Sequence, residues 1–559
     1  MYAIEPDYDG GWWAIVQASG LAAYKGYALT VAATQYIAAR HAADGGVVAV
    51  RQVLGASASV RPSIAADGQG GLWVAGGGTS SLDCGAGVDV LVTTAHPFVC
   101  RLGKAAQQTQ RRSYTTTTTG VVVAIIQHSA SGLVAIVRET AATFTMSTYT
   151  TTAASGVVGD VIVALDAATL NVVYGRNFPG AAAGNKLTLY PRIVVLECPK
   201  YVADGVFAFG ATLLGETVTF PAPYNGVTGG AGSRVVVFTL RADLAMGVMI
   251  TDLATSGTLT GVALRGLARG KDGGVWAYVN GIGTVTHPSG TVVTPGTAPG
   301  SGVLFKLSSA LALVGGAAGV TALGGGGAGS LVSTNGLSVG VAGDVWIGGV
   351  YTSGTTLGVG GATLPLYGGS TSGLVVFRVS WTSGPGLVQV MSTRTLSGSP
   401  KVDVTAFAAL PDCGLLVAAQ GAAAGTAAVH HGGGVTNVGL GDTGVLRFEH
   451  RVRCRGRNIV QYVAREASEQ GDGIGHQPRV FWGRIAQGQV KAGDEVEVLP
   501  SGVKAIIAEV RRAGETVVHA VAGESAGLVF DRHWNLFTND NDHEGMPSEY
   551  VPGRLNHVV

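Results

Sequence analysis

Charged side chains are scarce in this sequence. Asp, Glu, Lys and Arg make up 13% of its 559 residues, against roughly 25% in an average soluble protein. The net charge of +1 provides no basic surface for nucleic acid or for an anionic membrane, so neither is expected as a partner. Helix-forming Glu, Lys, Gln and Met are also few, whereas Gly (88 residues), Ala, Val and Thr are abundant. This composition favours short strands and tight turns, and we expect an all-β fold.

Long apolar runs are missing as well. Gly and Thr interrupt every apolar stretch before it reaches the ~18 to 20 residues of a membrane span. The N-terminal sequence MYAIEPDYDGGWW carries acids where a secretory signal has a basic region, so classical secretion is not expected.

Cysteine occurs five times, without CxxC spacing or a neighbouring histidine at metal-ligand distance. An odd set of widely spaced cysteines predicts free buried thiols, with no metal and no cofactor. The five positions are Cys84, Cys100, Cys198, Cys413 and Cys454.

A turn followed by a short apolar strand recurs seven times in residues 1–448. The copies are DYDGGWWAIV at 7–16, DGQGGLWVAG at 67–76, SASGLVAIV at 129–137, ADGVFAFG at 203–210, KDGGVWAYV at 271–279, AGDVWIGGV at 342–350 and PDCGLLVAA at 411–419. A large residue lies at the centre of each copy, and successive copies are 60 to 73 residues apart. These structural repeat positions are Trp13, Trp73, Val134, Phe207, Trp276, Trp346 and Leu416.

Each copy is followed by a Gly/Thr loop and a second apolar strand, for example VVVFTL at 235–240. One unit therefore has enough strands for a four-stranded antiparallel sheet, whose faces would be buried against neighbouring units. Radial closure of seven such sheets gives a seven-bladed β-propeller. A β-solenoid is the structural alternative, although its coils repeat every ~20 to 30 residues.

The repeat resembles the SBBP-type repeats of bacterial β-propellers, in which a D-x-x-G turn precedes an aromatic strand and a Gly-rich loop precedes an apolar one. The resemblance covers about 440 residues; the third and seventh copies lack the aromatic residue.

The composition changes near residue 445, which marks a domain boundary. Residues 446–559 contain 14 Lys and Arg and 15 Asp and Glu, or about a quarter of the segment. Residues 449–475 are expected to be a linker or a closing strand of the last blade, with a short helix in 458–470, and 538–559 a tail. The acidic NDNDHEG at 539–545 belongs to that tail, because it lacks the ligand spacing of a calcium loop.

Residues 476–537 alternate like strands of a small antiparallel β-barrel, with a hairpin turn at 491–494. They resemble the second domain of translational GTPases such as EF-Tu, through Gly483-Arg484, Lys491-Ala492-Gly493-Asp494, Leu499-Pro500 and Ala522-Gly523-Glu524. The resemblance implies a docking surface. It implies no GTP chemistry, because the chain has no G-x-x-x-x-G-K-[ST] loop.

The sequence contains no recognisable catalytic motif, so we do not expect an enzyme. A propeller can nevertheless hold a catalytic site in its central funnel. Arg451, Arg453, Arg455 and Arg457 alternate and in a strand would share one face, suited to an acidic partner; the simpler interpretation is a solvated closing strand. His430-His431 is interpreted as a surface pair rather than half of a metal site. The runs at 115–119 and 149–152 are expected to be exposed threonines, which also occur in glycan-binding proteins.

These observations favour a non-enzymatic structural or interaction protein, a propeller scaffold that binds protein partners in a larger assembly. The Ala/Gly/Val/Thr bias is typical of a virion component assembled in the cytoplasm. The alternative is a carbohydrate-binding or carbohydrate-active propeller with a site in its central funnel.

Overall fold

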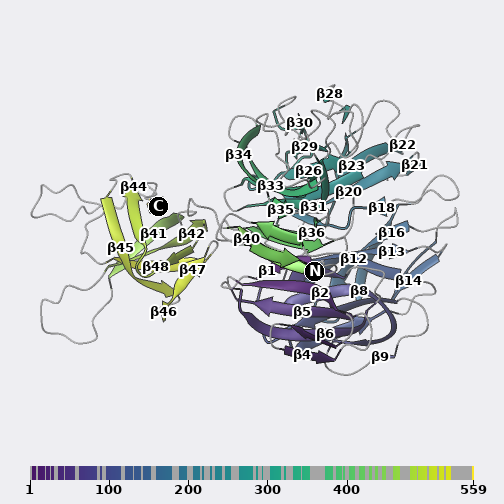
Figure 1. Ribbon diagram of the computed structural model, residues 1–559, viewed down its shortest axis with the longest axis horizontal. Coiled ribbons are helices and arrows are strands. Elements are labelled where there is room, and N and C mark those ends of the chain that lie inside the picture. Colours follow the sequence, from purple (N-terminus) through teal and green to yellow (C-terminus); the bar gives the residue numbers. More distant parts are fainter. Residues whose placement is uncertain are drawn as a thin grey trace, which may run out of the picture. The chain divides into compact units, whose positions relative to one another are not determined.

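The structure is a computed structural model that describes 49 strands and some of the turns between them (Figure 1). The described residues outside the strands are 7, 11, 42, 45–46, 62, 67–71, 84, 103–107, 114, 131, 147–148, 167–171, 178, 190–193, 270–274, 308–315, 340, 343–344, 492–494, 518 and 524. This part of the chain contains no helix, and the expected all-β fold of small antiparallel sheets is confirmed.

The chain divides into two compact units. The first comprises Met1–Ala409 and Leu415–Phe448, and the second comprises Leu410–Gly414 and Glu449–Val559.

Seven antiparallel groups of strands, here numbered sheets 1 to 7, follow one another along the first unit. Sheet 1 has β1 (Ala3–Pro6), β2 (Trp12–Ala18), β5 (Gln35–His41) and β6 (Val47–Ala56), and sheet 2 has β7 (Ser63–Ala66), β8 (Leu72–Asp83), β10 (His96–Leu102) and β11 (Gln108–Ser113). Sheet 3 has β12 (Gly120–Ser129), β13 (Gly132–Glu139), β16 (Gly159–Asp166) and β17 (Val172–Asn177). Sheet 4 has β18 (Thr188–Leu189), β19 (Val194–Glu197), β20 (Val206–Leu214), β23 (Ser233–Arg241) and β24 (Met246–Leu253).

The remaining three sheets repeat this order of pairing. Sheet 5 has β25 (Ala263–Arg269), β26 (Val275–Asn280), β29 (Gly302–Leu307) and β30 (Val320–Ala322), and sheet 6 has β31 (Leu331–Val339), β32 (Val345–Thr352), β33 (Ser372–Trp381) and β34 (Pro385–Ser392). Sheet 7 has β36 (Val402–Ala409), β37 (Leu415–Gly421) and β40 (Thr443–Phe448).

The first unit also contains short strands, most of which form small separate sheets. They are β3 (Leu21–Tyr24) with β4 (Tyr27–Thr30), β9 (Asp89–Val90) on β8, β14 (Thr143–Met146) with β15 (Tyr149–Thr152), β21 (Thr217–Val218) with β22 (Val227–Thr228), β27 (Val285–Thr286) with β28 (Val292–Val293), and β35 (Arg394–Leu396) with β38 (Ala427–His430) and β39 (Val435–Val438). In the β14–β15 hairpin, pairs of threonine hydroxyls face each other on one side, at 3.2 Å for Thr145 and Thr150. Phe144 is buried on the other side.

The seven repeat positions are all buried. Each lies on the strand that pairs with the first strand of its sheet, namely β2, β8, β13, β20, β26, β32 and β37. Trp13 and Trp73 have no exposed surface, and each indole N–H donates to the next sheet, Trp13 to Gly70 O (3.2 Å) and Trp73 to Gln127 Oε1 (2.7 Å). Because a large ring on a central strand must be covered on both sides, each sheet needs its neighbour to complete its core.

Neighbouring sheets share their apolar cores. One cluster of buried residues joins Trp13 of sheet 1 to Val74 and Phe98 of sheet 2. Another joins Ile162 of sheet 3 to Phe238 of sheet 4. The sheets are also not fully separate, because pairing of β6 with β8 joins sheets 1 and 2 into one nine-stranded sheet.

The second unit contains β41 (Arg457–Arg465), β42 (Arg479–Gln487), β44 (Glu495–Leu499), β45 (Val503–Arg512), β46 (Glu515–Val517), β48 (Ser525–Phe530) and β49 (His557–Val558) in one sheet, and β43 (Gln489–Lys491) with β47 (His519–Val521) in another. A turn is present at 491–494, as predicted: Asp494 N–H donates to Lys491 O (3.2 Å), and Gly493 has a φ of +87°, which glycine adopts without strain. The strands on its two sides do not form a hairpin, because β43 pairs with β47, and β44 pairs with β45 and β49.

Two expectations are wrong. Residues 457–465 form strand β41 instead of part of a helix, because apolar Ile459 and Val463 pair across to β42 in an antiparallel ladder. Cys84 and Cys100 are not free thiols: they form a disulfide with their Cα atoms 6.8 Å apart. The chain bends after β8 and returns in β10, so residues 16 apart in sequence meet in one buried cluster. The other three cysteines lie outside the described residues.

Candidate functional site

The first strands of the sheets lie against one another and form what we call the first-strand edge. Strand β7 contacts β1 and β12, β25 contacts β19 and β31, and β36 contacts β31 and β1. Side chains that are far apart in sequence therefore meet here, and this edge contains the best candidate for a functional site in the described part of the chain.

Among the described side chains, Glu5 on β1 is an acidic group of this edge. Burial raises the pKa of its carboxyl from 4.5 to about 7, although the Arg192 guanidinium and a hydrogen bond from the Ala66 backbone act in the opposite direction. A carboxyl with a pKa near neutrality exists in both charge states at physiological pH, and such groups are enriched at functional sites.

Arg192 approaches from the segment between β18 and β19. Backbone hydrogen bonds fix this segment, from Tyr190 N–H to Gly210 O (2.8 Å) and from Arg192 N–H to Tyr190 O (2.7 Å). The exposed Arg192 side chain then donates to Leu337 O on β31 at 3.3 Å. Because β25 contacts both β19 and β31, this side chain spans the first-strand edge of sheet 5.

Tyr190 lies close to a second guanidinium, that of Arg265, as well as to that of Arg192. Its hydroxyl donates to the backbone oxygen of Arg265 on β25 at 2.7 Å. Burial raises the pKa of this phenol, while the charges of Arg192 and Arg265 lower it, so both guanidiniums act on one phenol. The exposed Arg265 lies at an irregularity in the β25–β26 register, between Leu264 and Gly266.

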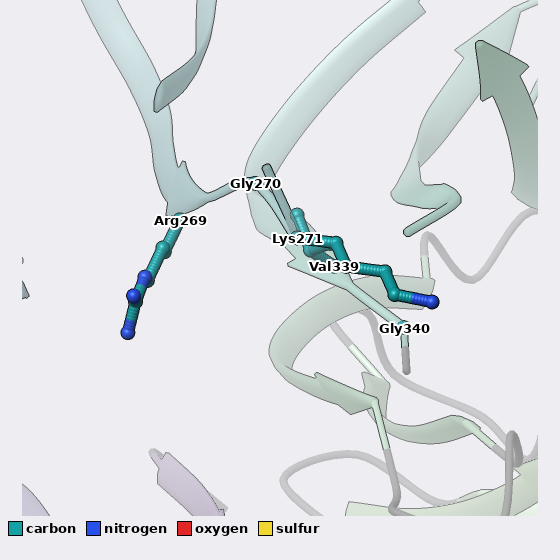
Figure 2. A pocket seen from close by; sticks show the side chains of 5 residues that line it. All are labelled: Arg269, Gly270, Lys271, Val339 and Gly340. Atoms are coloured by element: carbon teal, nitrogen blue, oxygen red, sulfur yellow. The ribbon is translucent and has the colours of Figure 1, made fainter. Parts of the chain in front are cut away.

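A cleft of about 350 Å³ opens at the turn end of β25, lined by Arg269, Gly270, Lys271, Val339 and Gly340 (Figure 2). Arg269 ends β25, and the turn after it is closed by the Gly270 N–H, which donates to Gly274 O at 2.8 Å. Figure 2 shows the Arg269 and Lys271 side chains extending away from each other on the two sides of Gly270.

The acids nearest to this cleft are already paired. Asp272 binds Lys306 Nζ at 3.0 Å, and Asp344 binds Arg378 Nη1 at 3.2 Å. Within the described residues, the following side chains form no ion pair: Arg192, Arg265, Arg269 and Lys271. They constitute an excess of positive charge, which we call the β25 cationic surface.

The Asp272–Lys306 pair belongs to an arrangement that recurs in sheets 1, 2, 5 and 6. A turn carboxylate binds a cation on the third strand, and in sheets 2, 5 and 6 that cation also lies over the repeat-position tryptophan, 5.4 to 5.6 Å from the ring centroid. The carboxylate–cation pairs are Asp7–Arg40, Asp67–Arg101, Asp272–Lys306 and Asp344–Arg378. These groups hold the turns in place.

The residues singled out from the sequence are not part of this site. Arg451, Arg453 and Arg455 lie outside the described residues, as do 115–119, 539–545 and His431. Arg457 begins β41, which pairs with β42 of the second unit and does not close sheet 7. His430 ends β38, opposite Arg394 and Val435. The described residues include no group of three potential metal ligands and no helix able to cross a membrane.

The β25 cationic surface was missed although part of it is visible in the sequence. Arg265, Arg269 and Lys271 fall within seven residues of a region otherwise poor in charge, and this density was the available signal. Arg192 could not be assigned to it, because only the packing of three sheets brings it there.

Comparison with known proteins gives no identification: no family model matches the chain, and no curated protein is similar to it.

Proposed function

We propose that the chain is a non-enzymatic interaction protein in which residues 1–448 form a seven-bladed β-propeller, a scaffold within a larger assembly. The observation that carries this proposal is the contact between β36 of the last sheet and β1 of the first. Sheets 3 and 4 meet through β16 and β18, and the other neighbours meet through their first strands. The order of contacts therefore returns to its start.

Hydrogen bonds between first strands support the same arrangement. Ile125 N–H donates to Ser63 Oγ (3.0 Å) and Ala409 N–H donates to Ser338 Oγ (3.0 Å). When the faces of each sheet are covered by neighbouring sheets, the accessible surfaces are the turn ends, the outer strands and the first-strand edge. Such surfaces are suited to binding partners, and the β25 cationic surface is one of them.

The second unit is proposed to be the docking barrel that its sequence resembles. Strand β44 pairs with β45 and with β49, and the path β49-β41-β42-β48-β45 leads back to it. This order supports a small barrel. Its core contains Phe481, Ile507 and Leu528.

Affinity purification of the tagged chain from its source cells or particles, followed by quantitative mass spectrometry, tests the function. We expect at least one protein in a fixed molar ratio that survives washing at moderate salt. Recovery of the chain alone, as a monomer by light scattering, from both cells and particles would contradict the proposal.

A second candidate function, carbohydrate binding at the first-strand edge, rests on Glu5. A carboxyl with a pKa of about 7 can donate or accept a hydrogen bond, and in glycoside hydrolysis a group of this kind serves as the acid. A glycan array probed with the native chain and with Glu5→Gln distinguishes the two candidates, because only the carbohydrate function predicts saturable glycan binding that the substitution weakens.

A further inference from the structure

The β25 cationic surface has a shape and charge that specify a partner. We propose that Arg192, Arg265, Arg269 and Lys271 bind an extended acidic segment of a protein partner; this inference rests on the proposed interaction function and assigns it a surface.

Charge is the first reason. The chain has few charged residues, and nearby carboxylates are held by cations of their own sheets, as in Asp272–Lys306 and Asp344–Arg378. The carboxyl on which the Arg192 charge acts belongs to Glu5, and its raised pKa leaves it only partly charged near neutral pH. Within the described part of the chain, positive charge is therefore left uncompensated here, and it attracts a negative partner.

The spread of the charges is the second reason. Arg265 and Arg269 are four residues apart on β25, which corresponds to about 13 Å along a strand. The side chains of Lys271 and Arg269 extend away from each other (Figure 2). One phosphate or carboxylate cannot contact cations that diverge in this way. A chain with acidic side chains at intervals can contact several of them.

The floor of the cleft is the third reason. Gly270 and Gly340 line it without side chains, and Val339 adds an apolar wall. A peptide backbone can approach such a floor closely. The guanidinium of Arg269, which also lines the cleft, can take a carboxylate through two hydrogen bonds.

The test uses the full-length protein and fluorescein-labelled poly-L-glutamate of about 20 residues, followed by fluorescence anisotropy at low and moderate salt. We expect Arg269→Glu with Lys271→Glu to weaken binding at least tenfold. The matched control is Lys104→Glu with Arg241→Glu, which reverses two exposed charges elsewhere in the same unit and should change affinity less than twofold. Equal losses in both double variants, or no loss in the first, would overturn the proposal.

Two competitors test the ligand class. Displacement of the peptide by 10 mM inorganic phosphate would indicate a small-anion site, and tighter Arg269-dependent binding of a single-stranded DNA of equal charge would indicate a nucleic-acid surface; either result contradicts an acidic protein segment. If the double reversal does not fold, as judged by its thermal melt, Arg269→Gln with Lys271→Gln replaces it, with the same expected direction.

Co-purification distinguishes a failure of this inference from a failure of the proposed interaction function. A partner that is recovered with the native chain and lost with the charge-reversal variant supports both. A partner retained equally by the variant refutes the surface and leaves the interaction function standing. Absence of any partner of the native chain refutes the function, whatever the peptide assay gives.

Discussion

Asp67 shows how much stability one turn carboxylate provides. Its side chain is 3% exposed. One oxygen accepts the backbone N–H groups of Gln69 (2.8 Å) and Gly71 (2.7 Å), and the other accepts Nε and Nη2 of Arg101 (3.0 and 2.8 Å). Replacing Asp67 with Ala removes all four hydrogen bonds and leaves the largely buried Arg101 without its anion.

The expected loss follows from that burial. Removing one partner of a buried ion pair costs about 3 to 5 kcal/mol, and since Arg101 is 27% exposed we expect Asp67→Ala to lower the free energy of unfolding by about 3 kcal/mol. Asp272→Ala is the matched control. The Asp272 carboxylate is 49% exposed, with one ion pair to Lys306 and a longer hydrogen bond from Gly274 N–H (3.2 Å), so its loss should cost about 1 kcal/mol.

Equilibrium urea unfolding of the full-length chain measures both variants, with circular dichroism and tryptophan fluorescence as independent probes of the transition. Equal destabilisation by Asp67→Ala and Asp272→Ala would refute the reasoning, because burial would then not decide the contribution. The double variant Asp67→Ala with Arg101→Ala adds a second check. If the two residues are coupled, the double variant loses less free energy of unfolding than the two single variants lose together.

Two further predictions concern Glu5 and the disulfide. Folding raises the Glu5 pKa from 4.5 to about 7, so the contribution of this carboxyl to stability is complete below pH 4.5 and is lost as pH rises through 7. The Glu5→Gln variant has no such titration. Its free energy of unfolding, relative to that of the native chain, should therefore rise by about 1 to 3 kcal/mol between pH 4 and pH 8. A gap between the urea midpoints that is equal at both pH values would contradict this. Cys84→Ser should lower the free energy of unfolding by about 3 kcal/mol, as for a disulfide that closes a loop of ~15 residues. A reductant should lower the urea midpoint of the native chain but not that of the variant. Equal sensitivity of the two proteins to the reductant would mean that Cys84 and Cys100 are not bonded.

The strand pattern was predictable where local rules decide it. A Gly-rich turn followed by alternating apolar residues specifies a hairpin and its buried face, and for that reason Trp276 and Trp346 could be placed on strands from the sequence. Pairing at long range could not be predicted. The pairing of β6 with β8 and the Cys84–Cys100 bond are two examples, and the spacing of residues in the sequence does not reveal either of them.

The helix expected within 458–470 failed for a related reason. Tyr462 and Val463 suit a strand as well as a helix, and tertiary pairing with β42 decided between them. The candidate site was the least predictable feature, since Arg192 and Leu337 are 145 residues apart.

The repeated ion pairs explain why the β25 cationic surface is informative. Asp67 is the first residue of the turn 67–71, Asp272 is the third residue of the turn 270–274, and Asp344 is the fifth residue of the turn 340–344. The position of the carboxylate changes, yet each carboxylate binds the cation opposite the repeat tryptophan. A sequence alignment of the turns therefore does not show this ion pair, although the ion pair recurs in the structure of the sheets. In a unit with so few charges, the acids of these turns are matched within their own sheets, whereas Arg192, Arg265, Arg269 and Lys271 form no ion pair with a described acid and lie on and beside β25. Pairing within the described residues does not account for these four cations, and the proposed acidic segment is the partner that would pair with them.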